Sequence, residues 1–281
     1  VRVGGVTVSH ASLHNEDGLN GLDIRIGDHV IVRRAGDVIP DIVSVVKEMR
    51  TGKEREFHMP RKCPVDGSAV VRDGVAFRCS SKTCGARHRE ALYHFVSRSA
   101  FNIEGLGRKI IDRFLDEGLI GDAADIFTLK TGDIAVLERF GEKSAQNIVD
   151  EAAGKKRISV SRFIYALGIF HVGEETSHLL AQRVANSKWQ IAKPVELLRE
   201  FQKMSTDDLQ QIRDIGPKVA ESIYKWFREP RNIALLKKLE NGGVELQSDK
   251  RHTTSDKFKG KTFVLTGTLA RMSRDEAKEK I

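Results

Sequence analysis

The chain repeats one apolar pattern four times between about Ile103 and Phe227. In each copy a glycine has apolar residues four positions before it, one position before it and seven positions after it. The glycines are Gly107, Gly141, Gly173 and Gly216, and the apolar residues are Ile103, Leu106 and Phe114; Leu137, Phe140 and Ile148; Ile169, Val172 and Leu180; and Ile212, Ile215 and Ile223. This spacing fits two short helices joined by a tight turn at the glycine, so four stacked helical hairpins are expected over residues 93–247.

The turn at each glycine has the chemistry of a phosphate site. Glycine can adopt a positive φ and lets another backbone come close. A helix that begins just after it points free N–H groups and the positive end of its dipole outward. The residues two positions after the glycines are Lys109, Lys143, Glu175 and Lys218. The pattern resembles the helix-hairpin-helix motif, which grips nucleic-acid backbone without reading bases. The alternative is four hairpins that only pack together, and four copies in register favour the motif.

Residues 1–57 are rich in β-branched residues and predict short strands. The runs 28–34 and 38–46 flank a turn signal at Ala35-Gly36-Asp37, and residues 12–18 could carry a short helix and its end. A small barrel of the OB type, without its first part, would fit this order. Such barrels bind nucleic-acid strands through a groove and basic loops.

Two adjacent arginines, Arg33 and Arg34, adjoin the predicted turn. Neighbours in a strand face opposite ways, so at most one of them lies on a given face of the sheet. Spacing alone leaves two interpretations open: one arginine contacts a bound strand, or both form a solvated pair at a sheet edge.

A candidate metal site lies within residues 58–92. The candidate ligands are Cys63, Asp66, Cys79 and Cys84. Zinc knuckles pair two close ligands from one turn with two from another, and three thiolates with one carboxylate form a chemically sound set, although oxygen is the harder donor. His88, four positions beyond Cys84, is an alternative fourth ligand. The remaining interpretation is a metal-free turn with three free thiols.

The last part of the chain predicts a linker followed by a new domain. Gly242-Gly243 and the polar residues 248–257 are typical of a linker. The strand-like run 261–269 ends in a Thr-Gly turn, and Ser273 lies three residues before Glu276, as in a capping box that opens a helix. Residues 258–281 are therefore expected to be the truncated start of an α/β domain.

Composition narrows the class of partner. The 281 residues carry a formal net charge of +8, which favours a polyanionic partner. No apolar run approaches membrane-spanning length and no signal-peptide pattern is present, so a cytoplasmic protein without a membrane partner is expected. The first residue is not methionine, and the chain is interpreted as cut from a longer protein. Three cysteines close together favour a metal site in a reducing compartment over a disulfide framework.

The order of these segments resembles one family, the bacterial NAD⁺-dependent DNA ligases. Val8-Ser-His-Ala-Ser-Leu-His-Asn15 and Arg33-Arg-Ala-Gly-Asp-Val-Ile-Pro40 resemble its OB domain, and the Cys63–Cys84 element resembles its four-cysteine zinc finger. The hairpins and Tyr93-His-Phe-Val-Ser-Arg98 resemble its helix-hairpin-helix domain, and Phe263-Val-Leu-Thr-Gly-Thr268 resembles the start of its BRCT domain. The resemblance implies a multidomain fold: an OB-like β-barrel at 1–57, a small zinc finger at 58–92, an all-α helix-hairpin-helix domain at 93–247 and a truncated α/β BRCT domain at 258–281.

The resemblance also implies a function. Members of the family seal nicks in duplex DNA by joining a 3′-hydroxyl to a 5′-phosphate, with NAD⁺ as the source of the adenylyl group and magnesium for the ligation chemistry. The OB domain is expected in the minor groove opposite the nick and the hairpins on the far side of the duplex. The zinc finger is expected to fix the angle between those two domains, and the BRCT domain to add weak contacts. The implied DNA-binding residues are Arg34, Val38, Ile39, Gly107, Lys109, Gly141, Lys143, Gly173, Gly216 and Lys218.

Two departures from the family are visible. The lysine that carries the adenylyl group belongs to a Lys-x-Asp-Gly string, which this chain lacks; its nearest strings are Pro64-Val-Asp-Gly67 and Val71-Arg-Asp-Gly74. No catalytic residue is therefore expected here, and the adenylation domain would precede Val1. Asp66 stands where the family has a fourth cysteine, so the fourth zinc ligand differs.

A second function class remains open at this point, a non-enzymatic DNA-binding repair scaffold built from the same modules. An upstream Lys-x-Asp-Gly segment would favour the ligase, and a native start codon at Val1 would favour the scaffold. The expected partner is nicked duplex DNA, and the expected state is a monomer in the cytoplasm, associated with the nucleoid.

Overall fold

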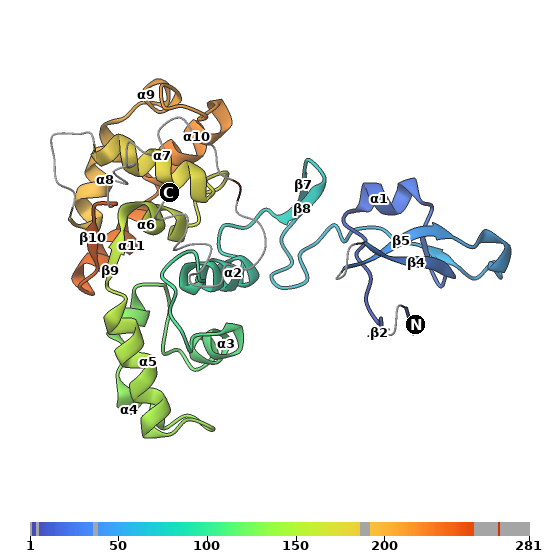
Figure 1. Cartoon of the computed structure of the whole chain (residues 1–281), viewed down its shortest axis with the longest axis horizontal. Helices are drawn as coiled ribbons and strands as arrows, with labels where there is room; N and C mark the ends of the chain where they lie inside the picture. The colour runs from blue at the N-terminus through green and yellow to red at the C-terminus, as the bar shows by residue number, and fades with distance from the viewer. Residues whose placement is uncertain (1, 4–5, 36–38, 186–191, 250–263, 265–281) are drawn as a thin grey trace. The chain divides into compact units, whose positions relative to one another are not determined.

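A computed structural model of the chain describes residues 2–3, 6–35, 39–185, 192–249 and 264 (Figure 1). The chain divides into two compact units, Val1–His88 and Arg89–Ile281. The expected α/β start at 258–281 lies outside the described residues apart from Val264, and so do residues 250–257 of the expected linker.

The first unit contains short antiparallel strand pairs. β4 (Val30–Ala35) pairs with β5 (Ile39–Val45), which confirms the two strands predicted on either side of residues 35–37. The other pairs are β1 (Arg2–Val3) with β2 (Val6–Thr7), β3 (Arg25–Ile26) with β6 (Arg55–Glu56), and β7 (Val70–Asp73) with β8 (Ala76–Cys79). Among the described residues of this unit each sheet has two strands, so the predicted barrel is represented by strand pairs and not by a closed sheet.

A helix and a 3-10 turn connect these strands. α1 (Glu16–Gly21) begins after Asn15, whose side chain accepts a hydrogen bond from Gly18 N at 2.9 Å. The helix predicted within residues 12–18 therefore starts later than expected, because the N-cap is Asn15. η1 (Lys47–Met49) follows β5.

An arginine ties the segment after η1 to the loop before β4. Arg50 donates to both carboxylate oxygens of Asp28, at 2.8 Å each, and to Asp23 Oδ2 at 2.9 Å. The Asp28 side chain is only 1% exposed. Because Arg50 hydrogen-bonds its ionised form, the pKa of Asp28 lies below its usual value. This ion pair stabilises the charged form of a carboxylate that would be costly to bury alone.

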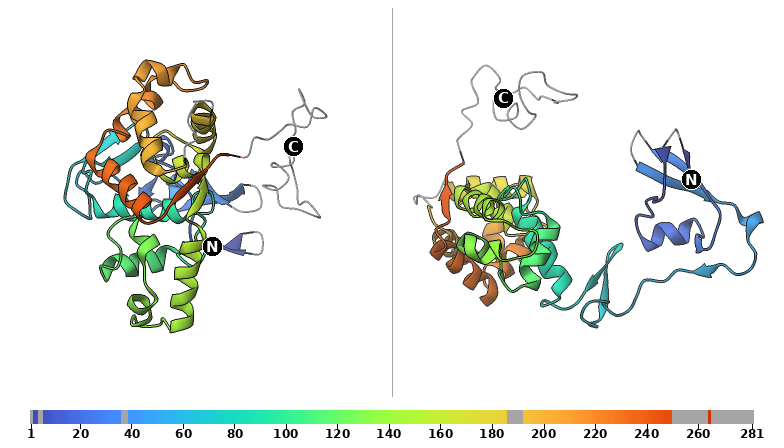
Figure 2. Two further views of the ribbon diagram at one scale, coloured as in Figure 1. Left: turned by 90° about the vertical axis from the view of Figure 1, so that its left-hand side faces the viewer. Right: turned by 90° about the horizontal axis from the view of Figure 1, so that it is seen from below.

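The second unit is helical, as Figure 2 shows. Its buried apolar side chains form one core. Its helices are α2 (Gly85–Val96), α3 (Arg108–Asp116), η2 (Asp125–Thr128), α4 (Thr131–Ala135), α5 (Glu142–Gly154), α6 (Val160–Ala166), α7 (Glu174–Ala185), α8 (Pro194–Lys203), α9 (Thr206–Gln210), α10 (Pro217–Trp226) and α11 (Pro230–Asn241). α2 begins in the first unit and continues into the second, so the domain boundary expected between residues 92 and 93 falls within a helix.

The apolar positions of the fourfold pattern form much of this core. Leu137, Phe140 and Ile212 are half-buried against it, and the other apolar pattern positions are buried. The half-buried positions belong to the second and fourth hairpins, whose first helices, α4 and α9, are short. The burial of these positions confirms that the apolar pattern marks the core of the hairpins. Their removal from water on folding stabilises the helical unit.

The hairpins form two consecutive pairs. In the first pair, the turn between α2 and α3 contacts α5, since Glu104 N donates to Glu151 Oε1 at 3.1 Å. In the second pair, the turn between α6 and α7 contacts α10, since His171 Nδ1 lies 3.2 Å from Ser222 Oγ. β9 (Arg157–Ser159) pairs in parallel with β10 (Glu245–Gln247), so the end of the helical region returns to the junction between the two pairs.

Candidate nucleic-acid interface and metal centre

A helix begins directly after each of the four anchor glycines, as the sequence pattern predicts. Gly107, Gly141 and Gly216 are the N-caps of α3, α5 and α10, and Gly173 O accepts from Ser177 N at 2.9 Å at the start of α7. All four glycines are exposed. The first turn of each second helix therefore presents its amide groups at the surface, where an anion can reach them.

The anchor glycines do not use the positive φ that glycine permits. The φ angles of Gly107, Gly141 and Gly216 are −68°, −115° and −83°, which any residue can adopt. The left-handed position lies two residues earlier in every hairpin, at Gly105 (84°), Arg139 (70°), His171 (67°) and Asp214 (63°). The backbone reverses there and then runs extended into the helix.

The space outside the anchor glycines is open. A Cβ added at any of the four would have no atom of the described chain within 4 Å, apart from those of the glycine and its two chain neighbours. The fold itself would accept a larger residue at these positions. The absence of a side chain instead leaves the helix N-terminus open to a close approach by a backbone from outside the chain.

The charges beside the anchors differ between hairpins. Lys109, Lys143 and Lys218 are exposed, and none of them pairs with an acidic residue within the described part of the chain. The third hairpin instead has Glu174 and Glu175 in the first turn of α7. Carboxylates at a helix N-terminus occupy the favourable end of its dipole and repel a phosphate. The turns at Gly107, Gly141 and Gly216 thus place a lysine near the helix N-terminus, with Glu142 beside Lys143, whereas the turn at Gly173 places two carboxylates there.

The third turn exposes an aromatic surface in place of a cation. Phe170 is 46% exposed and its ring lies 4.0 Å from that of His171. His171 occupies the left-handed position and contacts Ser222 of α10. This turn is therefore held by packing between the third and fourth hairpins.

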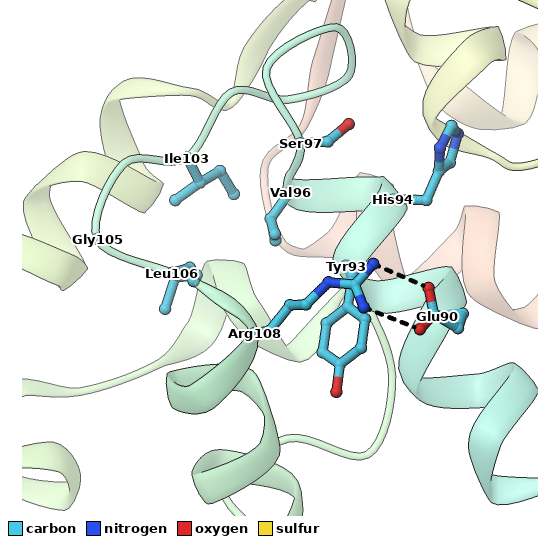
Figure 3. A pocket seen from close by; sticks show the side chains of 10 residues that line it. Glu90, Tyr93, His94, Val96, Ser97, Ile103, Gly105, Leu106 and Arg108 are labelled. Atoms are coloured by element: carbon cyan, nitrogen blue, oxygen red, sulfur yellow. Dashed lines mark hydrogen bonds and ion pairs between the residues drawn. The ribbon is translucent and has the colours of Figure 1, made fainter. Parts of the chain in front are cut away.

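A cavity of about 610 Å³ lies beside the first turn, between α2 and the start of α3 (Figure 3). Ile103 and Leu106 from the turn and Val96 from α2 form its apolar lining. On its charged side Arg108 donates to the carboxylate of Glu90 at 3.2 and 3.3 Å and lies over the ring of Tyr93 at 4.7 Å.

Tyr93 and Arg89, on α2, anchor this helix to α3. Tyr93 Oη donates to Asp112, and Arg89 donates to Asp112 and Asp116 at 2.6 Å each. The hydrogen bond that Asp112 accepts from Tyr93 is the main cause that lowers the pKa of Asp112, and it also raises the pKa of Tyr93. The network holds the start of α3 in a defined position relative to α2.

The first unit brings the four candidate metal ligands together. The ligand atoms of Cys63, Asp66, Cys79 and Cys84 all lie within 4.8 Å of one another. The Sγ atoms of Cys63 and Cys84 are 3.7 Å apart, close to the roughly 3.8 Å expected between two thiolates on one tetrahedral zinc ion. His88 is exposed and is not part of this group. The donor set fits zinc by ligand type and by spacing.

Local structure explains how these ligands converge. Gly67, at φ 71°, turns the chain so that its N–H donates to Cys63 O at 2.9 Å. Cys79 ends β8, and Cys84 lies just before α2. Two loops thus supply one close pair of ligands each, which is the arrangement of a zinc knuckle.

The ionisation of the cluster is uneven without a cation. The Ser68 N–H, which donates to Asp66 Oδ1 at 3.0 Å, is the main cause that lowers the pKa of Asp66 to about 2. The backbone N–H of Arg87 lowers the pKa of Cys84, whereas burial raises the pKa of Cys79 to about 11. A bound metal ion favours thiolates, so it would remove the penalty at Cys79.

Of the residues expected to contact DNA from the first unit, Arg34 is the partner of Pro40 in the β4–β5 ladder, and Ile39 is the partner of Ala35. Val38 lies outside the described residues. Arg33, the neighbour of Arg34, pairs with Asp41 at 3.3 Å. One arginine of the pair is therefore engaged within the hairpin.

The left-handed residues of the turns were missed by sequence reasoning. Gly105 and Asp214 belong to residue types that are enriched at positive φ, and they could have marked this position. His171 is also of a type enriched at positive φ, but Arg139 carries no such signal, so the position shared by all four turns becomes visible only in the structure.

Three family matches and several relatives bear on these features. Residues 1–54 match the NAD-dependent DNA ligase OB-fold domain, residues 98–153 the SAM-like helix-hairpin-helix tandem and residues 162–236 the helix-hairpin-helix motif. The chain is 43% identical to the DNA ligases of Halothermothrix orenii and Geobacter metallireducens and 44% identical to that of Nitrosococcus oceani. Each alignment covers 100% of the chain and 40% or 41% of the relative, so the chain spans about two-fifths of the length of these proteins. None of the described helices is long and apolar enough to cross a bilayer.

Proposed function

Because the chain is related over its whole length to bacterial DNA ligases, and its first 54 residues to the OB-fold domain of the NAD-dependent type, we propose that it is the DNA-gripping part of an NAD⁺-dependent DNA ligase. The parent enzyme would seal nicks in duplex DNA by joining a 3′-hydroxyl to a 5′-phosphate. It would act as a monomer in the cytoplasm, associated with the nucleoid. The DNA ligase relatives favour this function over a non-enzymatic repair scaffold.

The open helix N-termini after the anchor glycines carry the proposal. The backbone of the duplex would lie against the turns at Gly107, Gly141 and Gly216, with phosphates close to the amides and to Lys109, Lys143 and Lys218. Gly173 would approach the duplex without a cation. Phosphate contacts of this kind position a protein on DNA and do not read its sequence.

The β4–β5 hairpin supports a second contact with DNA. Arg34, Val38 and Ile39 would enter the minor groove opposite the nick. Backbone and groove contacts from two units of one chain would hold a nicked duplex on more than one side, which a single module cannot do.

The Cys63, Asp66, Cys79 and Cys84 cluster would hold zinc. The ion would connect the loop at residues 63–67 with the residues from β8 to the start of α2, and so stabilise the segment that leads into the helical unit. Zinc closed by four protein ligands has a structural role and supplies no reactive water.

The chemistry of ligation would belong to other parts of the parent protein. The sequence contains no Lys-x-Asp-Gly string, and no residue of this chain is assigned a catalytic role. NAD⁺ would be bound where the adenylated lysine lies, and magnesium would serve the ligation steps.

A chimera tests this function. The corresponding region of the Halothermothrix orenii DNA ligase is replaced by this chain, and sealing of a nicked, fluorescently labelled duplex is measured with NAD⁺. The proposal predicts sealed product that requires NAD⁺ and is absent from the relative lacking that region. A folded chimera that adenylates itself but neither binds nor seals nicked DNA would contradict it.

A further inference from the structure

The metal cluster is asymmetric in burial. Cys63 and Cys84 are 7% and 1% exposed, and Cys79 is partly buried. Asp66 is exposed. The soft sulfur donors therefore face the protein, and the one hard oxygen donor faces water.

The Asp66 carboxylate is held at the edge of the cluster by a backbone contact. Ser68 N donates to Oδ1 at 3.0 Å, and the two carboxylate oxygens lie 3.5 and 3.6 Å from Cys79 Sγ. This hydrogen bond fixes the carboxylate within reach of an ion that the three sulfurs share. An orienting partner of this kind is common for metal-ligating carboxylates.

Within the described chain Asp66 has no competitor as the fourth ligand. His88, the nearest alternative in the sequence, lies four residues beyond Cys84 on α2. It is exposed and does not belong to the group of four candidate ligands. The fourth position of the site is thus occupied by a carboxylate on the solvent side.

We infer that Asp66 is the exchangeable ligand of the metal centre, the side from which the ion enters and leaves and at which a small thiol or chelator first coordinates. This rests on the proposed zinc site. A carboxylate oxygen is a poorer match than a thiolate for zinc among sulfur ligands, and its exposure lets a competing donor approach without unfolding the loops.

As a consequence, the fraction of this metal site that is occupied by zinc depends on the thiols and chelators in solution that compete for the ion. An ionised aspartate and a thiolate carry the same charge, so Asp66→Cys changes the softness and reactivity of the fourth donor and leaves the charge of the site unchanged. This makes Asp66→Cys the matched variant, and His88→Ala the control outside the cluster.

The first experiment measures zinc release from the full chain to a coloured pyridylazo-resorcinol chelator. Release should be slower in Asp66→Cys than in the unmodified chain, by about tenfold or more, because even changes to the groups that orient a metal ligand typically alter affinity by roughly 10–100-fold. His88→Ala should release zinc at the unmodified rate. Equal rates for the unmodified chain and Asp66→Cys would overturn the inference.

The second experiment counts thiolate ligands with cobalt. The thiolate-to-cobalt absorption of the unmodified chain should be about three-quarters of that of Asp66→Cys, since three sulfurs replace four. Asp66→Ala should keep the three-sulfur intensity while losing zinc faster, which tests the inference even where Asp66→Cys does not fold. An Asp66→Ala release rate equal to that of the unmodified chain would overturn it. Purified chain that binds no zinc would instead remove the proposed zinc site itself.

Discussion

Gly105 and Gly107, two residues apart in the first turn, differ in what a side chain at each position would meet. Gly105 has a φ of 84°, and a Cβ added there would lie 3.6 Å from Ile148 Cγ1. Gly107 has an ordinary φ, and a Cβ added there would meet nothing in the described chain within 4 Å. The first serves the fold, and the second is available to a ligand.

Alanine at these two positions should separate stability from binding. Gly105→Ala should destabilise the helical unit by about 1–2 kcal/mol, the usual cost of a left-handed non-glycine residue. Gly107→Ala should cost less than about 1 kcal/mol and weaken binding to nicked duplex DNA. Thermal unfolding and fluorescence anisotropy measure the two effects. Unchanged DNA affinity in Gly107→Ala would contradict the role given to the open turn.

The Asp28–Arg50 pair predicts acid sensitivity of the first unit. The pKa of Asp28 is lowered in the folded chain, so its contribution to stability is present above the unfolded value of about 3.9 and is lost as the pH falls toward the folded value. Asp28→Asn should therefore destabilise the unit at pH 7 and have less effect near pH 3. Amide hydrogen exchange within residues 1–88 measures this. An equal effect at both pH values would show that the ion pair does not account for it.

At the scale of elements, the spacing of apolar residues around the four glycines was sufficient to predict where the helical hairpins lie in the sequence. Apolar residues at fixed offsets from a glycine bury one face of each helix, and that requirement is the same in all four copies. The turn conformation was less visible, because the left-handed position carries a different residue type in each hairpin and Arg139 is of a type that rarely adopts a positive φ. The convergence of the metal cluster followed from the spacing of its cysteines.

The third hairpin allows a gain of function. Glu175→Lys places a cation where the other three hairpins have one, so DNA affinity should rise and the salt dependence should steepen by about one phosphate contact. Asp150→Lys in the middle of α5 makes the same charge change away from any helix N-terminus. It should produce a smaller effect. Equal effects of the two variants would mean that only net charge matters and that the turns are not phosphate sites.

At the scale of the whole molecule, the chain combines two units with different contacts to one proposed ligand. The helical unit offers helix N-termini and lysines, and the first unit offers a strand hairpin and a metal cluster. The order of these modules could be predicted, because each has its own local signature. The pairing of β3 with β6 could not, since these strands are distant in the sequence.

The most direct test of the account is the salt dependence of binding to a nicked duplex by the chain and by Lys109→Gln/Lys143→Gln/Lys218→Gln. Each phosphate contact contributes about 0.9 to the slope of log affinity against log salt, so the triple variant should reduce that slope by up to about three and keep the same indifference to sequence. An unchanged slope in a folded variant would show that these lysines are ordinary solvated surface and that the hairpin turns do not grip the DNA backbone.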